Sequence, residues 1–206
     1  MKVLVIGATG GTGRHVVRRL LSRGDFVRAF ARNPADVTER SERLEVFQGN
    51  ARDAEAVDRA ATGVEAVVSA FGPRSLKRDD IQETLARHLV AAMHKHGVRR
   101  LVNLSAWGAG DSAKRAGPLF ALIRNTILRY VFADKERAEA ILLDPGLEVV
   151  NVRPGRLLNS PARGGVKASL DGSGIKKVLA RDDLAAFMVE QVHSAAWVHK
   201  SPLIGY

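Results

Sequence analysis

The chain has 206 residues, of which 46% are hydrophobic and 26% charged, as expected for one globular domain with a substantial core. It contains no cysteine, which excludes disulfides, thiolate nucleophiles and cysteine-ligated metals and is typical of the reducing cytoplasm. The net charge of +10 favours an anionic partner, but the basic residues are spread along the chain and only 5% of residues are aromatic, so we expect a small anionic molecule rather than nucleic acid.

The first apolar run begins at the start of the sequence and leads directly into a glycine-rich turn. Residues 2–6 predict a buried strand, and residues 12–23 repeat apolar side chains at helical spacing. We expect no signal peptide ahead of this strand, and no apolar run approaches the roughly 20 residues that a membrane span requires. The sequence therefore predicts a cytoplasmic protein without a membrane segment.

The turn at residues 7–13, Gly-Ala-Thr-Gly-Gly-Thr-Gly, predicts a site for the diphosphate of a dinucleotide. Its backbone N–H groups and the positive end of the following helix dipole point at an anion. The first glycine permits the sharp turn, the second lets backbone approach the phosphates, and the last lets the helix pack closely on the strand. The alternative is a glycine turn without a ligand. The residues expected to contact the dinucleotide here are Gly7, Thr9, Gly10, Gly11, Thr12, Gly13 and Arg14.

The end of the second predicted strand, residues 26–31, indicates which nucleotide binds. NAD-binding units place an acidic residue about 20 residues past the glycines, where it holds the ribose 2′-hydroxyl. Arg32 occupies that place here, and a guanidinium can hold a 2′-phosphate through two hydrogen bonds. The sequence therefore favours NADP(H) over NAD(H), the alternative being a solvated arginine at a strand end.

The third and fourth predicted strands, residues 43–47 and 65–70, are followed by two further candidate cofactor contacts. The amide of Asn50, next to Ala51, can pair with the adenine edge because it has both a donor and an acceptor. Phe71 and Gly72 let the cofactor lie against backbone. The alternatives are a turn asparagine and a simple strand terminator.

The fifth predicted strand, residues 99–105, ends at a candidate catalytic hydroxyl. Ser105 stands where a side chain at the carboxyl end of a central strand faces the reacting ring. Trp107 can stack on a flat substrate. The alternatives are a capping serine and a core tryptophan.

The remaining elements complete an alternation of strands and helices. Helices are predicted over residues 53–62, 79–97, 133–143 and 181–194, and a strand over 147–153. Such alternation predicts an α/β fold with a doubly wound parallel sheet, the Rossmann fold, as a single domain over residues 1–206. We expect residues 154–180, rich in glycine and proline, and the C-terminal part to form the substrate side.

The segment 107–130 has three interpretations. After early glycines it is apolar, and it is compatible with a helix packing on the sheet, a substrate lid or an oligomer contact. The sequence shows no metal-ligand cluster. His94 and His96 are two residues apart and do not share a helix face, so we expect no metal site.

These motifs resemble the atypical short-chain dehydrogenase/reductase superfamily and, within it, the NAD(P)H-binding, NmrA-like branch that contains biliverdin IX-beta reductase, also called flavin reductase. The resemblance implies a serine beside the nicotinamide at Ser105, an arginine on the 2′-phosphate at Arg32, and reduction of flavins and linear tetrapyrroles with NADPH. It covers nearly the whole chain, at residues 7–13, 32, 49–50, 90–93, 96–98, 105–106, 134–137, 170–174, 183–184 and 187–188.

One departure from the larger superfamily bears on mechanism. That superfamily uses Tyr-x-x-x-Lys, in which the tyrosine donates the proton and the lysine holds the nicotinamide ribose. The residue four before Lys135 is Val131, and Tyr130 is one position away, about 100° around a helix. We therefore expect no tyrosine proton relay, as in the flavin-reductase branch. The branch also usually has an acidic residue at the Asn50 position.

The sequence leads to one preferred function and two alternatives. We expect an NADPH-dependent reductase that passes a hydride to a flat conjugated acceptor such as free flavin, a reaction in which cofactor and acceptor carry the chemistry. Ser105 and Lys135 are the candidate catalytic residues, with Pro154 near the nicotinamide and Trp107 and Leu157 as pocket walls. The alternatives are an NADP(H)-sensing regulator without turnover and a relative of sugar-nucleotide epimerases and dehydratases.

Overall fold

An eight-stranded, mostly parallel sheet forms the centre of the molecule. The computed structural model describes residues 1–72 and 75–206. The strand order is β3-β2-β1-β4-β5-β6-β10-β8, and only β8 runs antiparallel to its neighbour. These strands are β1 (Lys2–Ile6), β2 (Phe26–Ala31), β3 (Leu44–Gln48), β4 (Ala66–Ser69), β5 (Arg100–Leu104), β6 (Glu148–Pro154), β8 (Lys167–Ser169) and β10 (Leu203–Gly205).

The order of the strands creates a crevice beside β1. From β1 the chain adds β2 and β3 on one side and then returns to add β4, β5 and β6 on the other. Ile6 at the end of β1 lies between Phe30 of β2 and Ser69 of β4 in the ladder. In a doubly wound sheet, ligands bind at the carboxyl ends of the strands where the order reverses. The predicted Rossmann fold is therefore confirmed, and the glycine turn lies at its switch point.

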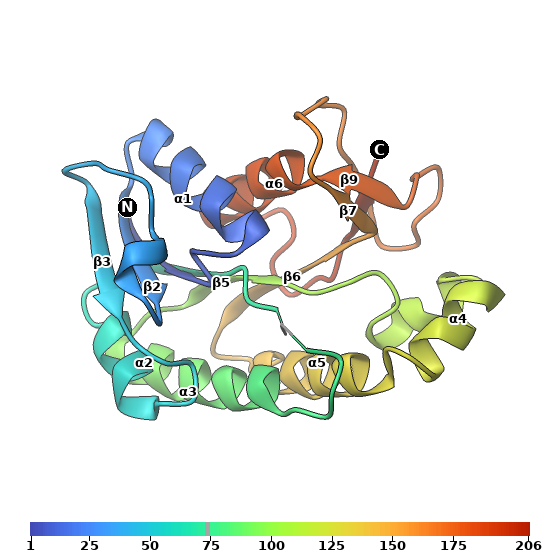
Figure 1. Ribbon diagram of the computed structural model, residues 1–206, viewed down its shortest axis with the longest axis horizontal. Coiled ribbons are helices and arrows are strands. Elements are labelled where there is room, and N and C mark those ends of the chain that lie inside the picture. The colour runs from blue at the N-terminus through green and yellow to red at the C-terminus, as the bar shows by residue number, and fades with distance from the viewer. Residues whose placement is uncertain (73–74) are drawn as a thin grey trace.

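Helices cover both faces of the sheet (Figure 1). One face carries α1 (Gly11–Arg23) and α6 (Arg181–His193), and the other carries α2 (Ala54–Ala61), α3 (Ile81–His96) and α5 (Arg129–Leu142). Five predicted helices thus correspond to observed ones, although α5 begins at Arg129 rather than at residue 133. No helix in the described ranges is both long enough and apolar enough to cross a membrane.

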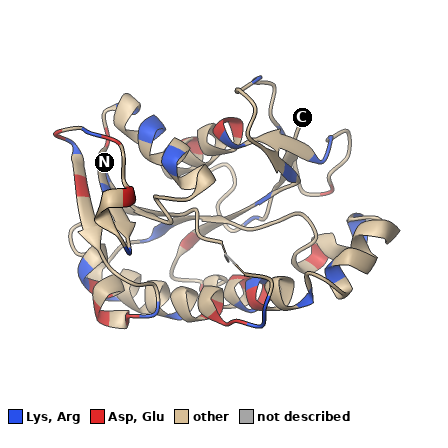
Figure 2. Ribbon diagram, viewed as in Figure 1, with Lys and Arg blue, Asp and Glu red and all other residues tan. Residues whose placement is uncertain are grey.

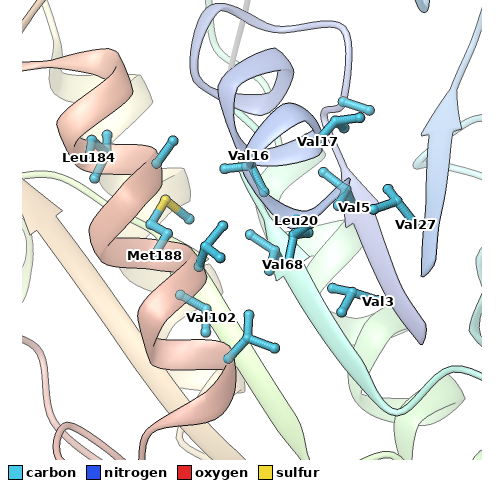
Figure 3. Close-up of a cluster of buried hydrophobic side chains, with 14 of the residues drawn as sticks. Val3, Val5, Val16, Val17, Leu20, Val27, Val68, Val102, Leu184 and Met188 are labelled. Atoms are coloured by element: carbon cyan, nitrogen blue, oxygen red, sulfur yellow. The ribbon is translucent and has the colours of Figure 1, made fainter. Parts of the chain in front are cut away.

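The apolar spacing of α1 explains how it is fixed on the sheet. Val16, Val17 and Leu20 fall on one face of the helix and are fully buried. Figure 3 shows them directed at valines of β1, β2 and β4, while Leu184 and Met188 of α6 fill the neighbouring space. Burying each such side chain stabilises the fold by about 1.5–3 kcal/mol, so this cluster holds the N-terminus of α1 at the strand ends.

The two segments without a clear sequence pattern form small elements at one end of the molecule. Residues 107–130 contain the 3-10 helix η2 (Gly110–Arg115) and α4 (Pro118–Asn125). Helix α4 has no buried residue and packs on α5, which argues against the first of the three interpretations, a helix packed on the sheet. Residues 154–180 form the short strands β7 (Arg156–Leu158) and β9 (Val178–Ala180), which pair with each other, and β8. A further 3-10 helix, η1 (Pro34–Asp36), follows β2.

Candidate functional site

A cavity of about 300 Å³ opens at the carboxyl ends of β1, β2, β3 and β4. Its walls are formed by the glycine turn and by residues at or after the ends of these strands. Of the predicted cofactor contacts, the cavity brings together Gly7, Thr9, Gly10, Arg32, Asn50, Ala51, Phe71 and Gly72. Gly11, Thr12, Gly13, Arg14 and Pro154 lie outside its lining.

The glycine turn is built so that only glycine fits at its two ends. Gly7 has a φ of 78°, and a Cβ there would lie 2.8 Å from the carbonyl oxygen of Ala70. A Cβ on Gly13 would lie 2.0 Å from the carbonyl oxygen of Gly7. Gly10 has an ordinary extended backbone with a φ of −76°, and its N–H closes the turn onto Gly7 at 2.9 Å. The packing of helix on strand therefore requires Gly13, whereas Gly10 leaves space for a ligand.

The N-terminus of α1 presents positive charge without a protein counter-charge. The first turn contains no acidic residue and has no side-chain cap. The N–H groups of Gly11, Thr12 and Gly13 find no acceptor among the described residues. The guanidinium of Arg14 donates to the carbonyls of Thr9 and Asp36 at 3.1 and 3.4 Å. This arrangement suits a bound anion.

Arg32 and Asn50 line the cavity after the neighbouring strands β2 and β3, and their side chains have different partners. Arg32 is exposed, and its guanidinium has no hydrogen-bond or ion-pair partner within the described part of the chain. The Oδ1 atom of Asn50 accepts the N–H of Arg52 at 3.1 Å, which is the turn geometry of the alternative interpretation. Arg32 is thus available to an external anion, while half of the Asn50 amide already serves the turn.

Sequence reasoning missed the ion pairs at the mouth of the cavity. Arg52 donates to Asp80 at 2.8 Å and to Asp79, and Arg52 and Asp79 both line the cavity. Hydrogen bonding to the guanidinium lowers the pKa of Asp80. These partners are separated by 27 and 28 residues, and no local pattern indicates that they meet.

Ser105 directly follows β5, and Pro154 is the last residue of the neighbouring strand β6. The N–H of Ser105 donates to Val152 at 2.7 Å, and that of Trp107 donates to Pro154 at 2.8 Å, so the ladder continues past the strands. Ser105 is 5% exposed, and its Oγ has no hydrogen-bond partner among residues 1–72 and 75–206. A buried hydroxyl is rarely left unpaired, so this atom is a candidate to bind a ligand or a water molecule.

Lys135 is buried rather than solvated. Its Nζ donates to Oε1 of Gln82 at 2.8 Å, and Nε2 of Gln82 donates to the buried carboxylate of Asp134 at 3.1 Å. Burial lowers the pKa of Lys135 to about 8, against the opposing effect of Glu139 and Asp134. Side chains alternate between the two faces of a strand, so Ser105 lies on the same face as Leu101. Leu101 belongs to the core cluster that includes residues of α3 and α5, so this is the face that these two helices cover. The serine and the lysine therefore share one side of the sheet.

The two tyrosines of the chain have other partners. The hydroxyl of Tyr130 accepts a hydrogen bond from Arg129 at 2.7 Å, and its side chain lines an outer groove with Ala133 and Arg137. Tyr206 donates to Asp183 at 2.6 Å. Neither hydroxyl is bonded to the buried Lys135.

The structure places the predicted pocket walls in packed positions. Trp107 is 5% exposed and packs with Ala116 and Leu203, with Nζ of Lys177 5.1 Å from the ring centroid. Leu157 is half-buried in β7 against the main core cluster. Packing alone accounts for the burial of Trp107, although its buried indole N–H has no partner in the described part of the chain.

No group of three or more metal-ligating side chains is present among residues 1–72 and 75–206. His94 pairs with Asp144 at 3.0 Å, and His96 pairs with Asp58 at 3.0 Å, so the two imidazoles serve separate ion pairs.

Comparison with known proteins shows which family the chain matches. A family model described as NAD(P)H-binding matches residues 7–195. Oxidoreductase stcQ of Emericella nidulans is 30% identical to this chain over an alignment, gaps included, of 208 positions. The alignment covers 90% of this chain and 75% of that protein. Sterol demethylase protein B of Methylococcus capsulatus is 37% identical over 116 residues, 53% of this chain, and the match spans only 35% of that longer protein.

Solved structures share the architecture over the whole length. ChuY, an anaerobilin reductase from Escherichia coli O157:H7, superposes with a TM-score of 0.82 and covers 100% of this chain and 97% of that one. The two sequences are 22% identical, so this likeness concerns the fold.

Proposed function

The chain belongs to the NAD(P)H-binding family, and we propose that it is an NADPH-dependent reductase that passes a hydride to a flat conjugated acceptor such as free flavin or a linear tetrapyrrole. The relative named oxidoreductase stcQ supports this assignment. We propose a conjugated acceptor because neither tyrosine hydroxyl is bonded to Lys135, where it could donate a proton.

The observation that carries the proposal is the position of the two tyrosines. Carbonyl reduction and sugar-nucleotide epimerisation in related enzymes need a tyrosine hydroxyl beside the active-site lysine. Here Tyr130 is bonded to Arg129 and Tyr206 to Asp183, while Lys135 is bonded to Gln82. A conjugated ring system that accepts a hydride needs no such donor, because its negative charge is delocalised.

The residues of the glycine turn and the strand ends fit an NADP(H) molecule. The unpaired N–H groups of Gly11, Thr12 and Gly13 would bind the diphosphate, and the unpaired guanidinium of Arg32 would bind the 2′-phosphate. The reduced nicotinamide supplies the hydride when bound. A preference for NADPH over NADH follows from Arg32.

The buried polar groups near β5 and β6 orient the reacting partners. The unpaired Oγ of Ser105 would hold the nicotinamide amide or the acceptor, beside Pro154. Lys135 would stabilise negative charge on the face of the sheet that Ser105 shares. Residues 154–180 and the C-terminal part would form the substrate side of the single domain, with Trp107 and Leu157 as walls.

Steady-state oxidation of NADPH with and without free flavin tests the proposed function. We expect free flavin to accelerate oxidation and the Tyr130→Phe variant to retain that activity. Loss of activity in Tyr130→Phe would restore a tyrosine mechanism. If the protein binds NADPH but neither flavin nor another conjugated acceptor accelerates oxidation, it is an NADP(H) sensor.

A further inference from the structure

We propose that Arg181, the first residue of α6, binds the diphosphate of the dinucleotide from the side opposite the cavity. The proposal rests on the proposed function in one respect, because it takes NAD(P)H to be the ligand. It adds to the cofactor site a residue from the C-terminal part of the chain. Figure 1 shows α6 beside α1 on the same face of the sheet.

The side chain of Arg181 is held directly over the start of α1. Its Nη1 donates to Oγ1 of Thr12 at 3.3 Å, and its Nε donates to Oδ1 of Asn159 at 2.9 Å. Thr12 is 3% exposed and belongs to the helical turn whose N–H groups are unpaired. The guanidinium therefore lies next to the backbone donors that face the diphosphate.

The positive charge of Arg181 is not balanced by a carboxylate within the described residues. Among the described residues its side chain has only the neutral partners Thr12 and Asn159 and no carboxylate within ion-pair distance. By contrast, the neighbouring Asp182 pairs with Arg19 of α1 at 2.6 Å across the same helix contact. Arg181 and Arg14 thus flank the positive end of one helix dipole without a counter-charge, which is unfavourable unless an anion binds between them.

The loop that carries Asn159 is fixed by a buried carboxylate. Asp183 is 4% exposed, and it accepts the N–H groups of Arg163 and Gly164 at 2.8 and 3.1 Å. Asn159 in turn accepts from Nε of Arg181 and leaves Nη1 directed at Thr12. Asn159 is therefore a positioning residue, because it selects the orientation of the guanidinium.

Gly11 provides the space in which Arg181 lies. Its backbone is not in the left-handed region, so the turn itself does not require glycine there. A Cβ at this position would lie 3.1 Å from Nε and 3.2 Å from Cδ of Arg181. The missing side chain thus allows the guanidinium to approach the turn closely.

Calorimetric titration of NADPH and of NADH into four proteins tests the proposal. These are the wild type, Arg181→Gln, Arg32→Ala and the charge-matched control Arg99→Gln, whose side chain is 68% exposed just before the amino end of β5, away from the carboxyl ends of the strands. We expect Arg181→Gln to weaken both nucleotides by the same factor, about tenfold to a hundredfold, because both contain the diphosphate. Arg32→Ala weakens NADPH only, and Arg99→Gln changes neither.

The result also separates this proposal from the proposed function. If the wild type binds neither nucleotide, both are overturned. If it binds NADPH while Arg181→Gln binds as the wild type does, only the role of Arg181 is overturned. A loss confined to NADPH would overturn it as well, since it would assign Arg181 to the 2′-phosphate. Asn159→Ala should weaken both nucleotides in the wild type and have no effect in the Arg181→Gln background, and additive losses would contradict the positioning role.

Discussion

We propose that the site has an adenosine half at the ends of β1 to β4 and a reacting half beside β5 and β6, and Arg32 and Lys135 show how the pairing of their charged groups differs. In the adenosine half, at the ends of β1 to β4, Arg32 is exposed and without a partner in the described part of the chain. In the reacting half, beside β5 and β6, Lys135 is buried and tied through Gln82 to Asp134. The guanidinium of Arg32 is thus open to a charged ligand, whereas the amine of Lys135 is already held by Gln82.

The same contrast applies to surface charge. Figure 2 shows Lys and Arg on the helices of both faces and in the loops, so the basic residues form no single band. The arginines around the site differ in how they are paired, and Arg52 at the mouth of the cavity is bound to Asp79 and Asp80. Arg14, Arg32 and Arg181 lack a carboxylate partner within the described residues, while Arg153 is paired with Glu139 at 2.7 Å and with Asp111 at 2.5 Å.

The largest expected effect separates two glycines of the same turn. Gly10→Val should abolish dinucleotide binding and lower the melting temperature much less than Gly13→Val does, because Gly10 has ordinary backbone angles and its Cβ would lie 3.2 Å from the carbonyl oxygen of Gly7. Gly13→Val should instead disrupt the fold, because its Cβ would lie 2.0 Å from the carbonyl oxygen of Gly7. Cofactor titration and circular dichroism melts of both variants check this. Retained binding in Gly10→Val would mean that the loop is only a turn.

The burial of Lys135 predicts a pH-dependent stability. Its pKa is about 8 in the folded state and 10.5 in an exposed lysine, so between these values the unfolded state binds more protons and stability rises with pH. Wild type should gain up to about 3 kcal/mol of unfolding free energy relative to Lys135→Met as the pH rises through this window. Urea unfolding of both proteins along the pH series measures the difference. A constant difference would contradict the burial of a titrating amine.

The sequence predicted the glycine turn and the strand ends better than it predicted the hydrogen bonds between distant residues. The strand ends and the glycine turn were predictable because each contact there follows an apolar run within a few residues, as Arg32 follows β2. The pairing of Lys135 with Gln82, 53 residues away, and of Arg181 with Thr12, 169 residues away, was not, because neither pair leaves a local pattern. Helix α4 was equally beyond prediction, since its apolar side chains at Leu119 and Leu122 are exposed.

Arg32→Ala tests whether the adenosine half selects the nucleotide. We expect NADPH to bind about 10- to 100-fold more weakly, because a charge-assisted hydrogen bond contributes about 1.5–3 kcal/mol, and NADH to change little. Calorimetric titration of both cofactors measures this. Equal affinities for NADPH and NADH in the wild type would remove the basis for the preference.

Ser105→Ala should have a smaller effect, confined to the reacting half. A neutral hydrogen bond contributes about 0.5–1.5 kcal/mol, so we expect turnover to fall about three- to tenfold with little change in NADPH affinity. Steady-state kinetics with free flavin, together with titration of NADPH, separates the two quantities. A loss of affinity without a loss of turnover would place Ser105 away from the reacting ring.

Hydride transfer to a conjugated acceptor is most directly tested by a single turnover without oxygen. The protein loaded with NADPH is mixed with free flavin, and stopped-flow absorbance follows the nicotinamide and flavin bands together. We predict that both bands decay with the same rate constant and that one flavin is reduced for each NADPH oxidised. Bound NADPH that persists while the flavin band stays unchanged would contradict hydride transfer and identify a nucleotide sensor.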